Sequence, residues 1–281
     1  MDRYPKRKID DIRLELNSAH DVLYYLLNGE SEISKPHSHN FLLLVLVETG
    51  DGVHSIDFIN YSILPKQLHI LFPDQVHSWE LGHNSKVHQL IIDHKVFDII
   101  GKSFRFGFAL YRNHPVFDLE QSDYEALLTE FLNVRNHLHK EPVLQDLVIA
   151  RLYVLGLMIS QVAARIFDNH TVIQRPPMLT DYLALIEKHF VGERSVSFYA
   201  AQLNITANYL NVACKKHFSC KATDLIDERV LLEAKRLLIS GLTIKETAYQ
   251  LKFSDVAYFS RYFKLKMHIT PKDFREQYAC S

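Results

Sequence analysis

The first half of the chain contains short apolar runs of strand length. Between residues 35 and 92 they read FLLLVLVETG, HSIDFINYSIL and KQLHILFPDQ, and Gly, Pro, Asp and Asn separate them. Gly50-Asp51-Gly52 lies between two of these runs and predicts a tight turn. The pattern therefore predicts an antiparallel β-sandwich or barrel in the N-terminal half.

After this region the apolar residues recur at helical spacing over Ser122–His139 and Val143–Phe167. The second segment carries one continuous stripe, formed by Leu144, Leu147, Val148, Arg151, Leu155, Met158, Ile159, Val162 and Ile166. A stripe of this kind either packs on its own barrel or forms a dimer interface. Its width does not distinguish the two arrangements.

A proline pair divides the chain. Pro176 and Pro177, in DNHTVIQRPPML, end regular structure and predict a domain boundary. We therefore expect a first domain at residues 1–167, a linker at 168–178, and a second domain at 179–281.

The second domain is predicted to be wholly helical. The expected helices are Leu179–Phe190, Ser197–Leu203, Ala207–Phe218, Thr223–Ser240, Ile244–Leu251, Asp255–Lys266 and one that begins at Pro271. The side chains expected to cap helices are Ser195, Thr206, Thr243 and Ser254.

Within this domain the sequence repeats weakly after about 48 residues. Ala200 matches Ala248, and Thr206 matches Ser254. Each copy combines a short helix, a tight turn and a longer helix, which is a helix-turn-helix. The small alanine lets the second helix cross closely over the first.

The outer face of each longer helix is suited to a DNA groove. The predicted DNA-binding residues are Asn208, Asn211, Lys215, Lys216, Val256, Ala257, Ser260, Arg261 and Lys264. The Arg261 guanidinium can pair bidentately with guanine or phosphate, the two asparagines can read adenine edges, and the lysines can bind phosphate. The alternative is that these are ordinary solvated side chains. A connecting helix roughly 27 Å long would hold the two copies about one DNA turn apart.

The stretch IKETAYQLKFSDVAYFSRYFKLKMHITPKDFREQY, Ile244–Tyr278, resembles the signature of the AraC/XylS family of bacterial transcription regulators. SFYAAQLNITANYLNVACKKHF and ERVLLEAKRLL extend the resemblance over the first copy and the connecting helix. It implies that both recognition helices enter adjacent major grooves of promoter DNA. Asn204 and Lys252 stand where the family turns usually have Gly, and Asn tolerates a left-handed backbone better than Lys does.

The stretches PHSHNFLLLVLVETGDGVHSID and ILPKQLHILFPDQVHSWE resemble the cupin-like arm of the same family. Three histidines fit cupin metal positions, but Leu43 and Leu44 occupy the place of the cupin glutamate. We therefore expect no metal and no cofactor. The expected effector pocket is lined by His37, His39, Phe41, Phe72, His77 and Trp79, although each aromatic residue could equally belong to the core.

Composition and charge agree with this division. The chain is 47% apolar and 23% charged, and it has neither an uninterrupted apolar run of membrane-spanning length nor a secretory signal, which predicts a cytoplasmic protein without membrane contact. Residues 1–177 carry 17 Lys and Arg against 22 Asp and Glu, whereas residues 178–281 carry 15 against 11. The basic excess lies where DNA binding is expected.

The predicted fold is α+β and multidomain, with an N-terminal cupin-like β-barrel, flanking helices, and a C-terminal all-α domain that holds two helix-turn-helix motifs. The predicted function is a homodimeric, non-enzymatic transcription regulator, by resemblance an activator, which binds promoter DNA, a small-molecule effector and RNA polymerase. Two alternatives remain open. One is a metal-dependent cupin enzyme with a DNA-binding tail, and the other is a regulator controlled by a protein partner.

Overall fold

The computed structural model describes residues 6–15, 20–104, 108–140, 143–168, 176–218 and 220–279. The chain forms two compact units, one within residues 5–170 and the other within residues 171–281. The predicted linker falls mainly on residues 169–175, which lie outside the described residues. Each unit is described by itself.

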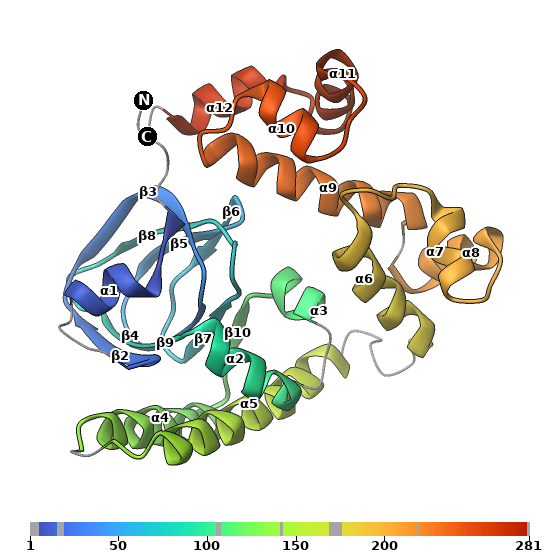
Figure 1. Ribbon diagram of the computed structural model, residues 1–281. Coiled ribbons are helices and arrows are strands. Elements are labelled where there is room, and N and C mark those ends of the chain that lie inside the picture. Colours follow the sequence, from blue (N-terminus) through green and yellow to red (C-terminus); the bar gives the residue numbers. More distant parts are fainter. Residues whose placement is uncertain are drawn as a thin grey trace. The chain divides into compact units, whose positions relative to one another are not determined.

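Two five-stranded sheets build the N-terminal unit, with strand orders β1-β3-β8-β5-β6 and β10-β7-β4-β9-β2 (Figure 1). The strands are β1 (Lys6–Arg7), β2 (Val22–Asn28), β3 (Ser31–His39), β4 (Leu42–Thr49), β5 (Gly52–Ile56), β6 (Ile59–Ser62), β7 (Gln67–Leu71), β8 (His77–Leu81), β9 (Lys86–Ile92) and β10 (Val116–Asp118). Their pairing is antiparallel except for β1 with β3. The predicted antiparallel sandwich is confirmed.

Strand β4 shows why this sheet lies at the centre of the unit. Leu43, Val45 and Val47 point into the core between the sheets, while Leu42 and Leu44 point to the opposite face and are also buried. A strand that is apolar on both faces requires cover on both. The helices supply the second cover (Figure 1), and they are α2 (His94–Ile100), α4 (Gln121–Leu138) and α5 (Gln145–Asp168).

The shorter elements of this unit were not predicted from the sequence. They are β1, β2, β10, α1 (Ile9–Glu15), α2, η1 (Gly101–Ser103) and α3 (Phe108–Asn113). All have seven residues or fewer, which is too short for a clear periodic pattern, and β2 lies at a sheet edge where Tyr25 is exposed. Their positions depend on pairing with distant strands.

The stripe of α5 packs within its own unit. Val148, Leu155, Ile159 and Val162 are buried, and Leu155 is completely inaccessible. An Arg151–Glu130 ion pair of 3.0 Å joins α5 to α4. Because Leu155 is completely buried within its own unit, it cannot lie at a dimer interface.

By length and composition alone, residues 145–166 are the one described segment that could span a membrane. In the structure 44% of its most apolar stretch is buried within the unit.

The C-terminal unit is helical, as predicted. Its helices are α6 (Pro177–His189), α7 (Val196–Gln202), α8 (Ala207–Phe218), α9 (Ala222–Ile239), α10 (Ile244–Gln250), α11 (Val256–Met267) and α12 (Pro271–Ala279). Buried aromatic residues fill the interior between them. Tyr182 contacts Tyr199 edge-on, and Phe259 and Phe274 pack against Phe263.

Three of the four predicted N-cap residues are confirmed. Thr206 Oγ1 accepts from the Tyr209 N–H at 3.1 Å, and Thr243 Oγ1 accepts from the Glu246 N–H at 3.1 Å. Ser195 is the N-cap residue of α7, as predicted, but its side chain makes no capping bond. Ser254 is wrong as the cap of α11, because Asp255 takes that place and accepts from the Tyr258 N–H at 2.7 Å. A carboxylate there also interacts favourably with the positive end of the helix dipole.

Both helix-turn-helix turns contain a residue with positive φ. Asn204 has φ 55° and Lys252 has φ 54°, which is the left-handed region. The backbone N–H of Lys252 donates to the Tyr249 carbonyl at 2.9 Å. This conformation disfavours side chains with a Cβ, and Asn tolerates it better than Lys does. The second turn therefore stores more strain than the first.

We expect Lys252→Gly to raise the free energy of unfolding by about 1 kcal/mol, because the relief of the left-handed strain exceeds the entropy that glycine adds to the unfolded chain. Thermal and urea unfolding followed by circular dichroism would measure the change. Lys252→Ala is the matched control, since it removes the amine but keeps the Cβ. An equal gain from alanine would contradict the explanation by backbone strain.

Candidate functional site

The two helix-turn-helix copies are α7 with α8 and α10 with α11. Ala200 and Ala248 are buried at the helix crossings, as the close approach of the helices requires. In the second turn Phe253 is buried and packs against Phe259 with ring centroids 5.1 Å apart. In the first turn Ile205 is only half-buried. The second copy therefore has the tighter core.

The structure exposes six of the nine predicted DNA-binding side chains, namely Asn208, Lys215, Lys216, Ala257, Arg261 and Lys264. Val256, Ser260 and Asn211 are half-buried. Asn211 has a structural contact that the sequence did not indicate, because its Oδ1 accepts from the Ala222 N–H at 3.1 Å and so fixes the start of α9. Its amide oxygen is therefore already engaged inside the unit.

Two tyrosines add to these faces. Tyr209 and Tyr258 occupy equivalent positions in the two copies, and their side chains are 53% and 47% exposed. Sequence reasoning did not select them, although the repeat that aligns them carried the signal. Aromatic rings this exposed on a helix surface are available to contact a nucleic-acid backbone or base.

Contacts within the C-terminal unit tie the two copies together. Arg194, which precedes α7, donates to the Leu251 carbonyl and places its guanidinium 3.6 Å from the ring centroid of Phe253 in the second turn. Asp227 of α9 accepts from the Tyr262 hydroxyl at 2.8 Å and pairs with Lys266 at 2.6 Å. Polar contacts as well as apolar packing therefore set the position of α11 relative to α7 and α9.

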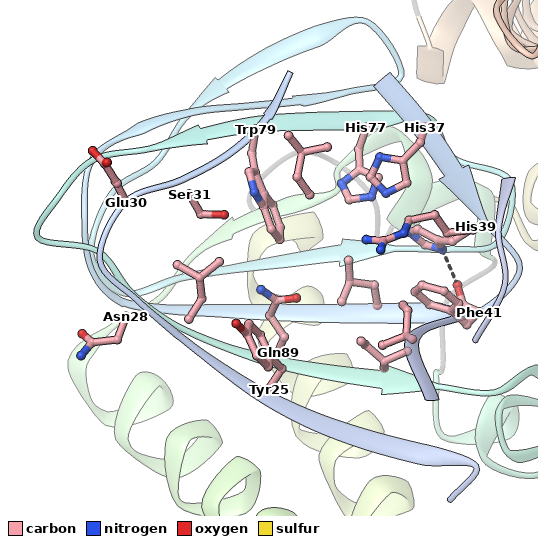
Figure 2. A pocket seen from close by; sticks show the side chains of 16 residues that line it. Tyr25, Asn28, Glu30, Ser31, His37, His39, Phe41, His77, Trp79 and Gln89 are labelled. Carbon is pink, nitrogen blue, oxygen red and sulfur yellow. Dashed lines mark hydrogen bonds between the residues drawn. The ribbon is translucent and has the colours of Figure 1, made fainter. Parts of the chain in front are cut away.

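A cavity of about 530 Å³ lies within the N-terminal unit (Figure 2). It is lined by Arg7, Ile12, Tyr25, Leu27, Asn28, Glu30, Ser31, Ile33, His37, His39, Phe41, Leu43, His77, Trp79, Gln89 and Ile91. Figure 2 shows Trp79 of β8 and Gln89 of β9 projecting into the same space. Because β8 and β9 belong to different sheets, the cavity lies inside the sandwich.

Five of the six predicted pocket residues line this cavity, and Phe72 does not. Phe72 is buried elsewhere, in a cluster with Phe97, Phe104 and Tyr111. It follows the end of β7, where the chain turns toward these helices, and its phenyl ring fills that apolar space instead. Among the polar lining residues that sequence reasoning missed, Gln89 had a detectable signal as an amide within an apolar run.

A chain of hydrogen bonds runs from the cavity into the protein. His77 Nδ1 lies 3.1 Å from His54 Nε2, and His54 Nδ1 lies 2.8 Å from His69 Nδ1. His69 Nε2 lies 3.2 Å from Gln67 Oε1, and Gln67 Nε2 donates to Asp118 Oδ1 at 2.8 Å. All three histidines are at most 2% exposed. Three strands, β5, β7 and β8, contribute these imidazoles.

Burial keeps these imidazoles uncharged. It lowers the pKa of His69 to about 4, and it lowers the pKa of His54 and of His77 well below the ordinary value. Burial, with a smaller contribution from the Arg7 charge, also lowers the pKa of His37 to about 4. At neutral pH each of the four imidazoles therefore has one N–H donor and one acceptor nitrogen.

The described residues contain no group of three or more His, Cys, Asp or Glu side chains arranged to hold a metal ion. His37, His39 and His77 do come together, with ring centroids of 4.4 Å between His37 and His77 and 5.1 Å between His39 and His77. His39 Nδ1 donates to the Phe41 carbonyl at 2.8 Å, and its ring stacks on that of Phe41. These rings form part of the cavity wall.

Comparison with known proteins matches both units. A family described as the AraC-like ligand binding domain matches residues 21–133, and a family described as a helix-turn-helix domain matches residues 199–277. Together these matches cover the sandwich with its cavity and the paired helix-turn-helix copies. The fold and the matches define a DNA-binding transcription regulator with an N-terminal ligand-binding domain. The chain belongs to the AraC family of such regulators.

Two relatives match over part of their length. An uncharacterized HTH-type transcriptional regulator in the cgkA 5' region of Pseudoalteromonas carrageenovora is 24% identical over 121 residues, which are 42% of this chain and 66% of the relative. The HTH-type transcriptional activator RhaS of Salmonella schwarzengrund (strain CVM19633) is 27% identical over 99 residues, which are 35% of this chain and 36% of the relative. The chain thus matches less than two thirds of either protein.

Solved structures are similar as well. ToxT from Vibrio cholerae O395 is 16% identical, with 90% of this chain and 96% of that chain covered and a TM-score of 0.44. The C-terminal domain of the response regulator yesN from Fusobacterium nucleatum is 29% identical, with 36% and 99% covered and a TM-score of 0.34.

We expect the N-terminal unit to lose stability between pH 6.5 and about 4. Above pH 6.5 neither state protonates these histidines, whereas below it the unfolded chain binds protons that the folded chain excludes. Each histidine whose pKa is lowered contributes up to about 1.4 kcal/mol per pH unit in this window. Urea unfolding followed by the fluorescence of Trp79, the single tryptophan, would measure it.

In the same titration the free energy of unfolding of His37→Leu should depend less steeply on pH than that of the unaltered protein. The difference should correspond to the uptake of up to one proton, because the variant lacks one histidine whose pKa is lowered. The urea midpoint of His37→Leu at pH 7 does not by itself test this prediction, because it also changes with the altered packing. A free energy of unfolding that stays constant from pH 7 to 4.5 would contradict the neutral state of the histidine chain.

Proposed function

We propose that this protein is a homodimeric transcription regulator, acting as an activator, whose occupancy of promoter DNA is controlled by a small molecule bound in the cavity. It acts in the cytoplasm, contacts RNA polymerase from its DNA-bound position, and catalyses no reaction. One observation carries the proposal. A single chain combines two exposed helix-turn-helix faces with a cavity of about 530 Å³ that has both polar and apolar walls.

The exposed side chains suggest a division of labour on DNA. Arg261 is proposed to read a base edge, because its planar fork pairs bidentately with guanine. Lys215, Lys216 and Lys264 are proposed to bind phosphates and fix the register. Asn208 is proposed to read an adenine edge. The remaining predicted residues, Asn211, Val256, Ala257 and Ser260, are proposed to border the contact surface.

Control by a ligand requires that the ligand bind one arrangement of the protein better than another. The cavity walls come from both sheets and from α1, which contributes Ile12. A molecule held there contacts elements that are distant in the sequence, and it stabilises the arrangement in which those elements fit it. The proposed effector residues are His37, His39, Phe41, His77 and Trp79.

A test of this function uses the full-length protein. DNA selected from a random pool by the protein serves as the probe, and metabolite fractions are added to the complex. Fractions that alter Trp79 fluorescence should also change DNA occupancy, because binding at the two sites is thermodynamically linked. Selection of no DNA sequence, or occupancy that ignores every cavity ligand, would contradict the proposal.

We expect Arg261→Ala to weaken binding of the selected DNA by about 1–3 kcal/mol and to relax specificity at one base pair. Fluorescence anisotropy at several salt concentrations would measure both effects. Lys188→Ala is the matched control, because Lys188 is exposed on α6, outside both helix-turn-helix copies. Unchanged affinity in Arg261→Ala would remove Arg261 from the reading surface.

The proposed dimer uses the outer side of α5. Tyr153 and Val154 are 39% and 43% exposed, next to the buried Leu155. We expect Val154→Asp to convert dimers to monomers that remain folded, because a buried charge without a partner disfavours association. Sedimentation would measure the mass. Leu155→Asp is the contrasting variant and should unfold the unit. Intact dimers in Val154→Asp would place the interface elsewhere.

A further inference from the structure

Two buried polar atoms on one strand have no hydrogen-bond partner among the described residues. They are His77 Nε2 and Trp79 Nε1, and their residues are 2% and 7% exposed. The two residues lie two positions apart on β8, so both side chains leave the same face of the sheet, and both line the cavity. Their ring centroids are 5.8 Å apart. A buried polar group without a partner is costly, and a ligand can remove that cost.

The hydrogen-bond chain behind His77 determines which kind of group its Nε2 is. Gln67 Oε1 accepts from the Leu64 N–H at 2.9 Å, and Gln67 Nε2 donates to Asp118, so both bonds fix the same orientation of the amide. His69 Nε2 must then donate to Gln67 Oε1.

Each later bond follows from the preceding one. With its proton on Nε2, neutral His69 accepts at Nδ1, and His54 must donate from its own Nδ1. His54 Nε2 then accepts, and His77 Nδ1 donates to it. The proton of His77 therefore lies on Nδ1, and its Nε2 is the acceptor at the end of the chain, on a side chain that lines the cavity. Trp79 Nε1–H is always a donor.

The remaining lining limits the charge of the ligand. Among the described residues it includes one cationic side chain, Arg7, and one carboxylate, Glu30. The apolar part of the wall comes from Ile12, Leu27, Ile33, Phe41, Leu43 and Ile91. A carboxylate placed against His77 Nε2 would meet a lone pair and would offer it no proton. These features favour a ligand without net charge that has an apolar body.

We infer that the cavity takes an uncharged molecule with an apolar body and a hydroxyl group, which donates to His77 Nε2 and accepts from Trp79 Nε1. The inference rests on the proposed function, since it names the chemical class of the effector. A hydroxyl group satisfies both atoms, because it has one donor and two acceptor lone pairs. An ether satisfies only the tryptophan. A carboxylate leaves the histidine unsatisfied and adds a charge.

Three probes with the same body separate these cases. They are 4-phenylphenol, 4-methoxybiphenyl and biphenyl-4-carboxylate, titrated into the full-length protein at pH 7.5 by calorimetry and by Trp79 fluorescence. We expect the phenol to bind about tenfold or more tightly than either of the others, because only the phenol satisfies both His77 Nε2 and Trp79 Nε1. Equal binding of the three, tighter binding of the ether or the carboxylate, or no binding of the phenol would overturn the inference.

In His77→Leu the phenol and the ether should bind with similar affinity, because the variant lacks the His77 Nε2 acceptor. His139→Leu is the control, since it changes an exposed histidine at the end of α4, outside both the cavity lining and the hydrogen-bond chain, and should retain the preference. If His77→Leu does not fold, nitrogen-15 NMR of the unaltered protein decides. Protonated Nδ1 with unprotonated Nε2 in His77 supports the inference, and a proton on Nε2 overturns it.

The two proposals fail separately. Tight binding of the carboxylate overturns the hydroxyl class but leaves ligand control of DNA binding in place. A phenol that binds as expected, while no cavity ligand changes DNA occupancy, leaves the chemical class in place and contradicts the proposed control.

Discussion

The hydrogen bond between Gln67 and Asp118 sets the direction of the entire buried histidine chain. A carboxylate oxygen can only accept, so the amide of Gln67 must turn its oxygen toward His69. The tautomer of each neutral imidazole then determines the tautomer of the next. The chain ends in an acceptor nitrogen of His77, a residue of the cavity wall. Two residues remote from the cavity thereby decide which chemical groups it can hold.

This arrangement explains how the sandwich accommodates several buried histidines. Burial alone would favour replacing them with apolar residues, because a buried polar atom is costly without a partner. In the chain each internal nitrogen has a partner, and the cost is confined to the end that faces the cavity. The unpaired imidazole nitrogen at the end of the chain is therefore that of His77, which lines the cavity.

In the C-terminal unit the proposed function requires a constant spacing between the two helix-turn-helix copies, not a cavity. Arg194 bridges from the start of the first copy to the turn of the second, and Asp227 holds α11 against α9. The strained turn at Lys252 is held between these contacts. Their shared effect is to hold the two copies in one arrangement, which the proposed reading of two successive grooves demands.

The sequence by itself determined the features that depend on local pattern. The strand runs, the long helices and the repeat with its alanines follow from periodicity along the chain, and the resemblance to a family with glycine in its turns implied the left-handed turn positions. The faces of the long helices follow as well, because helical spacing places Arg261 and Lys264 opposite Phe259 and Phe263. Five of the predicted pocket residues could be named because the stretches that contain them resemble the cupin-like arm of the family.

Only the tertiary structure decided which residues meet across long sequence distances. It paired Gln67 with Asp118, 51 positions away, and it brought Arg7 and Gln89 to one cavity. It also moved Phe72 into a separate aromatic cluster and placed Leu155 inside its own unit. A strand pattern states that a side chain is buried but not which partner it meets, since that depends on strand order and register.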